Sequence, residues 1–167
     1  KGPSPILEMK SQPQHNSSKI YQEELISING LGLDSQEDFS ITGKAMVTDV
    51  PITYLGYVNR DTGVIEEVGH PLDGRSIEDS ILIYPKGSGS TVAPYVLMGL
   101  IYTGKGPKAI INRDVCPLTL PACSLLDLPY GHGFEQDPCL KINDGDLIEM
   151  KRENEKVTVK ILQRSEN

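Results

Sequence analysis

A short glycine–serine loop between two apolar runs constrains the fold of this 167-residue chain more than any other stretch. The run before the loop, residues 80–85, ends at a proline and has the length and residue types of a buried strand. The run after it, residues 92–102, is apolar on nearly every side, which predicts a buried helix. Pro94 fits the first turn of that helix, where a missing N–H costs nothing.

The loop itself, residues 86–91, alternates glycine and serine at the expected N-terminus of the helix. Backbone N–H groups are unpaired at such a place, and the helix dipole favours negative charge there. The loop can therefore bind an anionic group or stabilise an oxyanion formed on one of its own serines. The alternative is a plain turn in which Ser90 or Thr91 serves as the N-cap.

Two familiar loop motifs are excluded by the neighbouring residues. No Gly-Lys-Ser or Gly-Lys-Thr closes the loop, so it is not a phosphate-binding P-loop. Alanine and proline follow it, so it is not the Gly-x-Ser-x-Gly elbow of the hydrolases.

The composition narrows the class of partners. A formal net charge of -7 argues against nucleic acid and against anionic membrane surfaces. No run approaches the roughly 20 apolar residues of a membrane span, and no signal-like segment is evident. The odd number of cysteines, three, indicates reduced thiols, and we expect a cytoplasmic protein.

The chain is long enough for one domain with a sizeable core. Residues 1–19 are rich in proline, serine, glutamine and asparagine, which predicts a disordered tail. Residues 20–167 are then a single domain.

Several strands are expected on either side of the central loop. Residues 39–47 alternate apolar and polar side chains with the period of two that marks a strand. We also expect strands at 52–58, with Gly56 inside it, and at 64–68, 108–112, 146–151 and 157–162. Residues 116–128 have room for at most a short helix.

Hairpins mixed with a strand–helix–strand unit predict an α/β domain with two β layers and helices packed on one of them. The loop at 86–91 then lies at the carboxyl end of its strand, where α/β folds place their ligands.

Three motifs, in this order, resemble the swivelling small domain of the aconitase X family. The first runs from Gly-Lys-Ala at 43–45 to Pro-Ile-Thr-Tyr-Leu-Gly at 51–56. The second joins Asp-Thr-Gly-Val-Ile at 61–65 to Gly-His-Pro-Leu-Asp-Gly-Arg-Ser-Ile at 69–77. The third runs from the proline at 85 to Gly-Ser-Thr-Val at 89–92. The resemblance covers residues 39–108 and continues more weakly to about residue 150. It implies a swivelling β/β/α domain.

The resemblance also implies a two-part enzyme. A large subunit would hold a [4Fe-4S] cluster and most of the substrate site, and this small subunit would dock over it and bring Ser90 as the base. Within the family the chain is most similar to archaeal small subunits whose enzyme, a hydro-lyase, removes water from mevalonate 5-phosphate to give anhydromevalonate phosphate. The isolated chain would be inactive.

Two alternatives stay open. One is the dehydration of cis-3-hydroxyproline or a related small hydroxy acid by the same kind of complex. The other is a non-catalytic adaptor domain on the same scaffold, because a fold does not fix a function.

The candidate site residues follow from the third motif and its neighbours. Ser90 is the candidate base, and N–H groups of residues 89–91 would stabilise its alkoxide. The candidate substrate contacts are Lys86, Gly87, Ser88, Gly89, Thr91 and His70.

Other polar side chains point less directly to a site. Arg75 and His132 are further candidate contacts, but the favoured interpretations are a solvated surface charge for Arg75 and an ordinary loop residue for His132. No metal ligand is expected in this chain, because Cys116, Cys123 and Cys139 form no Cys-x-x-Cys motif. We expect exposed apolar surface around the loop to mark the docking face.

Overall fold

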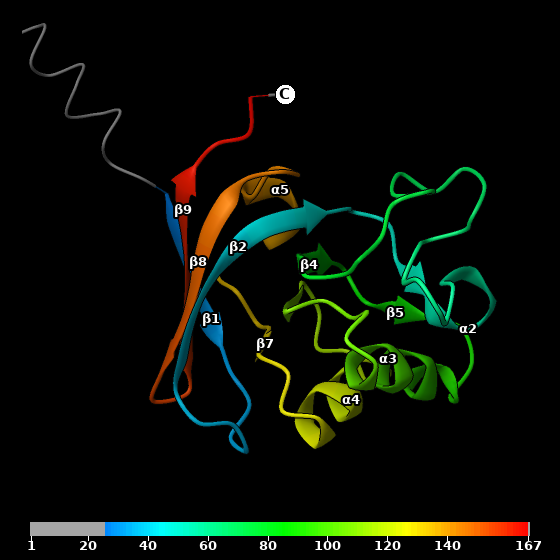
Figure 1. Cartoon of the computed structure of the whole chain (residues 1–167). Helices are drawn as coiled ribbons and strands as arrows, with labels where there is room; N and C mark the ends of the chain where they lie inside the picture. The colour runs from blue at the N-terminus through cyan, green and yellow to red at the C-terminus, as the bar shows by residue number, and fades with distance from the viewer. Residues whose placement is uncertain (1–25, 167) are drawn as a thin grey trace, which may run out of the picture.

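The computed structural model describes residues 26–166, and its main feature is a seven-stranded sheet (Figure 1). The strands are β1 (Ser27–Leu31), β2 (Phe39–Val47), β4 (Ile81–Tyr84), β6 (Ala109–Asn112), β7 (Tyr130–Gly131), β8 (Leu147–Glu153) and β9 (Lys156–Gln163). They follow the order β1-β9-β8-β2-β4-β6-β7. The first four pair antiparallel, and β2, β4, β6 and β7 pair parallel, so β2 joins an antiparallel half to a parallel half.

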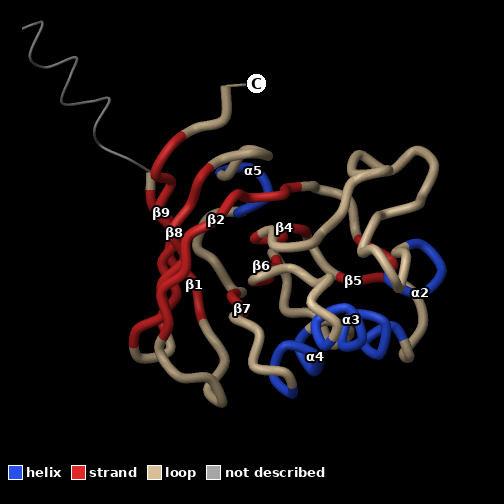
Figure 2. Tube along the Cα trace, in the orientation of Figure 1, coloured by secondary structure: helices blue, strands red, loops and turns tan. Residues whose placement is uncertain are grey.

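The helices are α2 (Tyr54–Tyr57), α3 (Ala93–Tyr102), α4 (Leu120–Leu125) and α5 (Pro138–Lys141). Figure 2 shows the antiparallel strands on one side of the parallel half, with α3 and α4 on the other. Within the described residues, no helix has the length and hydropathy needed to cross a membrane.

Side chains of β4 show how the layers are held together. All four residues of this strand are buried. Ile81 and Ile83 belong to the core shared with the antiparallel half, whereas Leu82 and Tyr84 belong to the core under the helices. Successive side chains of a strand point to opposite faces of the sheet, so β4 is covered on both faces. The predicted arrangement, two β layers with helices packed on one of them, is confirmed.

The free edge of β1 is covered by the segment that follows β7. The N–H of Leu31 donates to the carbonyl oxygen of His132 at 2.7 Å, and the N–H of His132 donates to the carbonyl oxygen of Leu31 at 2.9 Å. The N–H of Glu135 donates to the carbonyl oxygen of Asn29 at 3.0 Å. A Cβ atom at Gly30 would lie 2.7 Å from the His132 carbonyl oxygen, so this close approach needs a glycine. The two ends of the sheet are thereby brought together.

Two expected strands are wrong. Residues 52–58 form only β3 (Ile52–Thr53) before the chain turns through α2, where Gly56 has a φ of 91°. Residues 64–68 make isolated bridges, Val58 with Ile65 and Val64 with Ser76, instead of a strand. The other predicted strands and the helix after the loop are present. The predicted tail at 1–19 lies outside the described residues.

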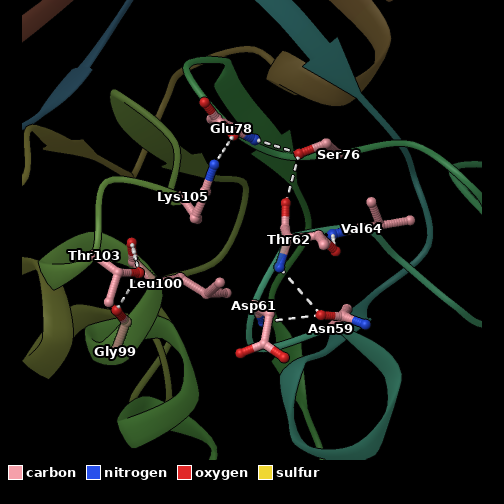
Figure 3. A network of polar contacts seen from close by, with 10 residues as sticks. All are labelled: Asn59, Asp61, Thr62, Val64, Ser76, Glu78, Gly99, Leu100, Thr103 and Lys105. Atoms are coloured by element: carbon pink, nitrogen blue, oxygen red, sulfur yellow. Dashed lines mark hydrogen bonds and ion pairs between the residues drawn. The ribbon is translucent and has the colours of Figure 1, made fainter.

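Side-chain hydrogen bonds add to the backbone bonds that shape the loop segment at residues 59–78 (Figure 3). The Asn59 side-chain oxygen accepts the N–H of Thr62 at 3.1 Å. The Ser76 hydroxyl donates to the Thr62 carbonyl oxygen at 3.0 Å. Lys105, just after α3, pairs with Glu78 at 3.5 Å. This ion pair connects the segment at residues 59–78 to the chain that follows α3.

Replacing Gly63 by alanine is expected to lower the free energy of unfolding by about 2 kcal/mol or more. Gly63 has a φ of 73°, and a Cβ atom there would lie 2.6 Å from the Lys105 carbonyl oxygen. Gly74→Ala is the matched control, because Gly74 has a φ of 86° but no atom lies within 4 Å of the place that its Cβ atom would take. Urea denaturation measures the free energy of unfolding of both variants. An equal decrease for the two variants would contradict the close approach at Gly63.

Candidate functional site

The glycine–serine loop begins where β4 ends and leads directly into α3, so it lies at the carboxyl end of its strand, as predicted. Its first part forms β5 (Gly87–Ser88), which pairs in parallel with β3. The carbonyl oxygen of Lys86 accepts the N–H of Ile52 at 3.2 Å. This pairing fixes one side of the loop against the chain that enters α2.

Ser90 is exposed at the N-terminal end of α3. Its hydroxyl oxygen accepts the N–H of Val92 at 3.2 Å, and its carbonyl oxygen accepts the N–H of Ala93 at 3.0 Å. The N-cap of the helix is Val92, without a side-chain cap bond. The alternative in which Ser90 or Thr91 caps the helix is therefore wrong, because the hydroxyl bonds within the turn that precedes the helix.

The surroundings of Ser90 favour negative charge. No partner within the described part of the chain accepts the backbone N–H groups of Gly89, Ser90 and Thr91. These groups and the Val92 N–H lie at the positive end of the α3 dipole. The arrangement can hold an anionic ligand group or stabilise a deprotonated Ser90 hydroxyl.

The two glycines of the loop lie close to neighbouring side chains, and the positive φ of Gly89 favours glycine at that position. Gly89 has a φ of 99°, and a Cβ atom there would lie 3.0 Å from the Thr53 side chain. Gly87 is buried, and a Cβ atom there would lie 3.4 Å from the sulfur of Cys116. The loop is therefore held closely between β3 on one side and Cys116 on the other. Ser88 is half-buried, and Thr91 is exposed.

The two candidate cations have different surroundings. Lys86 is exposed at the start of the loop, and no carboxylate among residues 26–166 pairs with it. Arg75 instead donates to Asp144 at 2.6 Å. Lys86 is thus the cation that the structure leaves available beside the loop.

His70 is buried, and both of its ring nitrogens have partners. Nδ1 accepts the N–H of Leu72 at 3.0 Å, so the ring proton lies on Nε2, which donates to the Pro51 carbonyl oxygen at 3.1 Å. Pro51 immediately precedes β3, which pairs with the loop. These contacts connect His70 to the loop through β3, and direct contact with substrate stays a prediction.

His132 lies in a different groove. That groove has a volume of about 450 Å³, and no residue of the glycine–serine loop lines it. The His132 ring lies 5.8 Å from the ring of Tyr130, and its partial burial lowers its pKa. His132 therefore does not join the loop residues.

A buried polar cluster beneath the loop was not predicted from the sequence. The hydroxyls of Tyr54 and Tyr84 lie 2.6 Å apart, and Tyr84 also contacts the Thr119 hydroxyl at 3.0 Å. Burial raises the pKa of both tyrosines, so their hydroxyls stay protonated. A Cβ atom at Gly87 would lie 3.4 Å from the Thr119 hydroxyl, which places this cluster directly under the loop.

The three cysteines, Cys116, Cys123 and Cys139, are free and buried. Residues 26–166 contain no group of three or more histidine, cysteine, aspartate or glutamate side chains placed to hold a metal ion.

Comparisons with known proteins identify the family of this chain. A sequence profile described as the aconitase X swivel domain matches residues 36–159. Two relatives are named phosphomevalonate dehydratase small subunit. The one from Methanocella arvoryzae is 37% identical over 107 residues, which cover 64% of this chain and 81% of the relative. The one from Methanosarcina acetivorans is 34% identical over 108 residues, which cover 65% and 75%.

A solved structure extends the comparison to the fold. The holo-form of aconitase X from Thermococcus kodakaraensis superposes with a TM-score of 0.70 at 26% identity, covering 80% of this chain and 98% of that one. The profile match spans most of the chain, including the whole glycine–serine loop. The chain belongs to the aconitase X swivel-domain family.

Proposed function

We propose that this chain is the small subunit of a hydro-lyase that removes water from mevalonate 5-phosphate to give anhydromevalonate phosphate, with Ser90 as the base. The names of the relatives support the dehydratase and the substrate. The observation that carries the role of Ser90 is its exposed hydroxyl at the N-terminus of α3, which accepts the Val92 N–H at 3.2 Å.

The base chemistry depends on stabilising an alkoxide. Removing a proton next to a carboxylate requires a strong base, and a serine alkoxide is strong but costly to form in water. The Val92 N–H donates to the Ser90 oxygen, and the unpaired N–H groups of residues 89–91 belong to the same turn at the positive end of the α3 dipole. The alkoxide takes the proton from a carbon atom of the substrate. The electron pair of the broken C–H bond forms the new C=C bond, and the C–O bond breaks as hydroxide leaves.

Lys86 is assigned to an anionic group of the substrate. It is exposed and stands immediately before Gly87 in the loop. A carboxylate or phosphate near Ser90 would contact this ammonium group together with the backbone of Ser88 and Thr91, since oxyanions favour such donors.

A large partner subunit completes the proposed site. In this proposal the partner holds the [4Fe-4S] cluster, because the described residues include no group placed to bind metal. The cluster would supply the Lewis acid for the departing hydroxyl. The exposed large apolar side chains include Val92 (46%) and Tyr95 (71%) at the start of α3 and Tyr57 (47%) in α2, and the proposal assigns these three to the docking face. Covering them would remove water from the site and strengthen the electrostatic effect of the N–H groups.

The substrate is tested with the complex purified anaerobically from the source cells. We expect it to dehydrate mevalonate 5-phosphate and to leave cis-3-hydroxyproline unchanged. Turnover of cis-3-hydroxyproline alone would replace the proposed substrate. A chain that purifies with a partner but is dispensable for any dehydration would favour the adaptor alternative.

A further inference from the structure

We propose that Cys116 is a positioning residue, whose thiol fixes the path of the glycine–serine loop and thereby the place of Ser90. The contact with the loop is a property of this chain alone. Its consequence for turnover rests on the function proposed above.

The contact between Cys116 and the loop is direct. The sulfur of Cys116 accepts the N–H of Gly87 at 3.1 Å, and Cys116 is only 2% exposed. Gly87 is itself buried, so no water is available to replace this hydrogen bond. A buried N–H without an acceptor is costly, which makes the thiol the element that ties this side of β5 to the domain.

The backbone of Cys116 is fixed in turn by buried groups. Its N–H lies 3.4 Å from the Tyr130 hydroxyl, which donates to the Asn112 side chain at 2.7 Å. Its carbonyl oxygen accepts the N–H groups of Thr119 at 3.1 Å and Leu120 at 2.9 Å, at the start of α4. Tyr130, Asn112 and Thr119 are fully buried. The backbone of Cys116 is therefore fixed in place, and its thiol can hold Gly87 of the loop.

Few other contacts hold the part of the loop that carries Ser90. On the opposite side, β3 pairs with Gly87 and Ser88 and extends no further. The bonds made by Ser90 itself go to Val92 and Ala93, within the same turn. The position of Ser90 relative to the domain thus depends on Gly87 and Ser88 before it and on α3 after it. A shift at Gly87 would move the hydroxyl, and small displacements of a reacting group have large effects on rate.

The experiment compares Cys116→Ala and Cys116→Ser with Cys123→Ala and Cys123→Ser. Cys123 is a matched control, because it is also buried and free but makes no hydrogen bond with the loop among the described residues. The first measurement is amide hydrogen exchange in the full chain without its partner. We expect Cys116→Ala to speed exchange at Gly87 by about tenfold or more, because the buried N–H loses its acceptor. Cys123→Ala should leave exchange at Gly87 unchanged.

The second measurement is turnover by the assembled complex. Cys116→Ala should lower kcat by about tenfold and change KM by less, because the rate depends more steeply than substrate binding on the position of the base. Cys116→Ser should recover part of both effects, since its hydroxyl can still accept the Gly87 N–H. A merely structural role would give no such rescue and no selective change at Gly87.

The proposal is overturned if exchange at Gly87 in Cys116→Ala equals that in Cys123→Ala. If the alanine variant fails to fold, Cys116→Val, which also lacks an acceptor, is compared with Cys123→Val. Exchange at Gly87 that is faster only in Cys116→Val supports the proposal, and equal exchange overturns it. A wild-type complex without dehydratase activity would refute the proposed function, whereas the exchange measurement would still decide whether Cys116 holds the loop.

Discussion

Ser90→Ala is expected to reduce dehydration of mevalonate 5-phosphate by about 10²- to 10⁴-fold, the range typical for the loss of a positioned general base. The variant removes the oxygen that accepts the Val92 N–H and leaves the backbone of the loop in place. Ser90 is exposed and contributes nothing to the core, so the fold and the assembly with a partner should be unchanged. Initial rates and co-purification, measured on the same preparation, separate the loss of chemistry from a loss of assembly.

Ser88→Ala is the matched control for this result. Ser88 lies two residues away on the same loop, and its hydroxyl has no hydrogen-bond partner among residues 26–166. Because the proposal assigns only the backbone of Ser88 to the substrate, Ser88→Ala should retain turnover within a few-fold of wild type. If the Ser90→Ala complex dehydrated the substrate at the rate of the Ser88→Ala complex, Ser90 would not be the base. This result would favour the non-catalytic adaptor alternative.

Tyr95→Glu is expected to weaken binding of the large subunit by about 30-fold or more, since buried tyrosines often dominate interfaces and an unpaired carboxylate is costly to bury. Tyr95 is 71% exposed in the first turns of α3, close in sequence to Ser90. Its neighbours Ala93 and Val96 belong to the core under the helices, so the helix should form normally in the variant. A binding titration with the large subunit measures the effect.

Leu140→Glu is the control for surface hydrophobicity. Leu140 is also 71% exposed, but it lies on α5, which contributes Cys139 to the core on the opposite face of the parallel strands. Figure 1 places α5 and α3 on opposite sides of β4. This variant should bind the partner as wild type does. Equal weakening by both substitutions, or by neither, would contradict a docking face around the loop.

The parts of the fold with a strong local pattern could be predicted from the sequence. β4 is a short apolar run that ends at a proline, and α3 follows with Pro94 in its first turn. The predicted strand at 52–58 failed because its apolar pattern is interrupted at Gly56, whose positive φ turns the chain after two residues of strand. Tyr54 of α2 is buried and Leu55 packs against the core, which explains the misleading apolar pattern.

The sequence predicted the place of the loop at a helix N-terminus, but it did not predict the residues that support the loop. The glycines and serines of 86–91 are contiguous, so their arrangement at a helix N-terminus follows from the sequence. The supports come from distant segments: Cys116 is separated from Gly87 by 29 residues, and Tyr54 from Tyr84 by 30. Only the crossing of these segments in the fold brings them together. His70 carries no local signal that it would bond to Pro51.

The most direct test of the account is a titration of this chain into its large partner subunit under anaerobic conditions, with the dehydration of mevalonate 5-phosphate as the signal. The account predicts a rate near background without the chain, a rise to saturation as wild-type chain is added, and no rise with Ser90→Ala at saturating concentration. A dehydration rate that is independent of the chain, or equal for wild type and Ser90→Ala, would contradict the claim that this domain brings the base to the reaction.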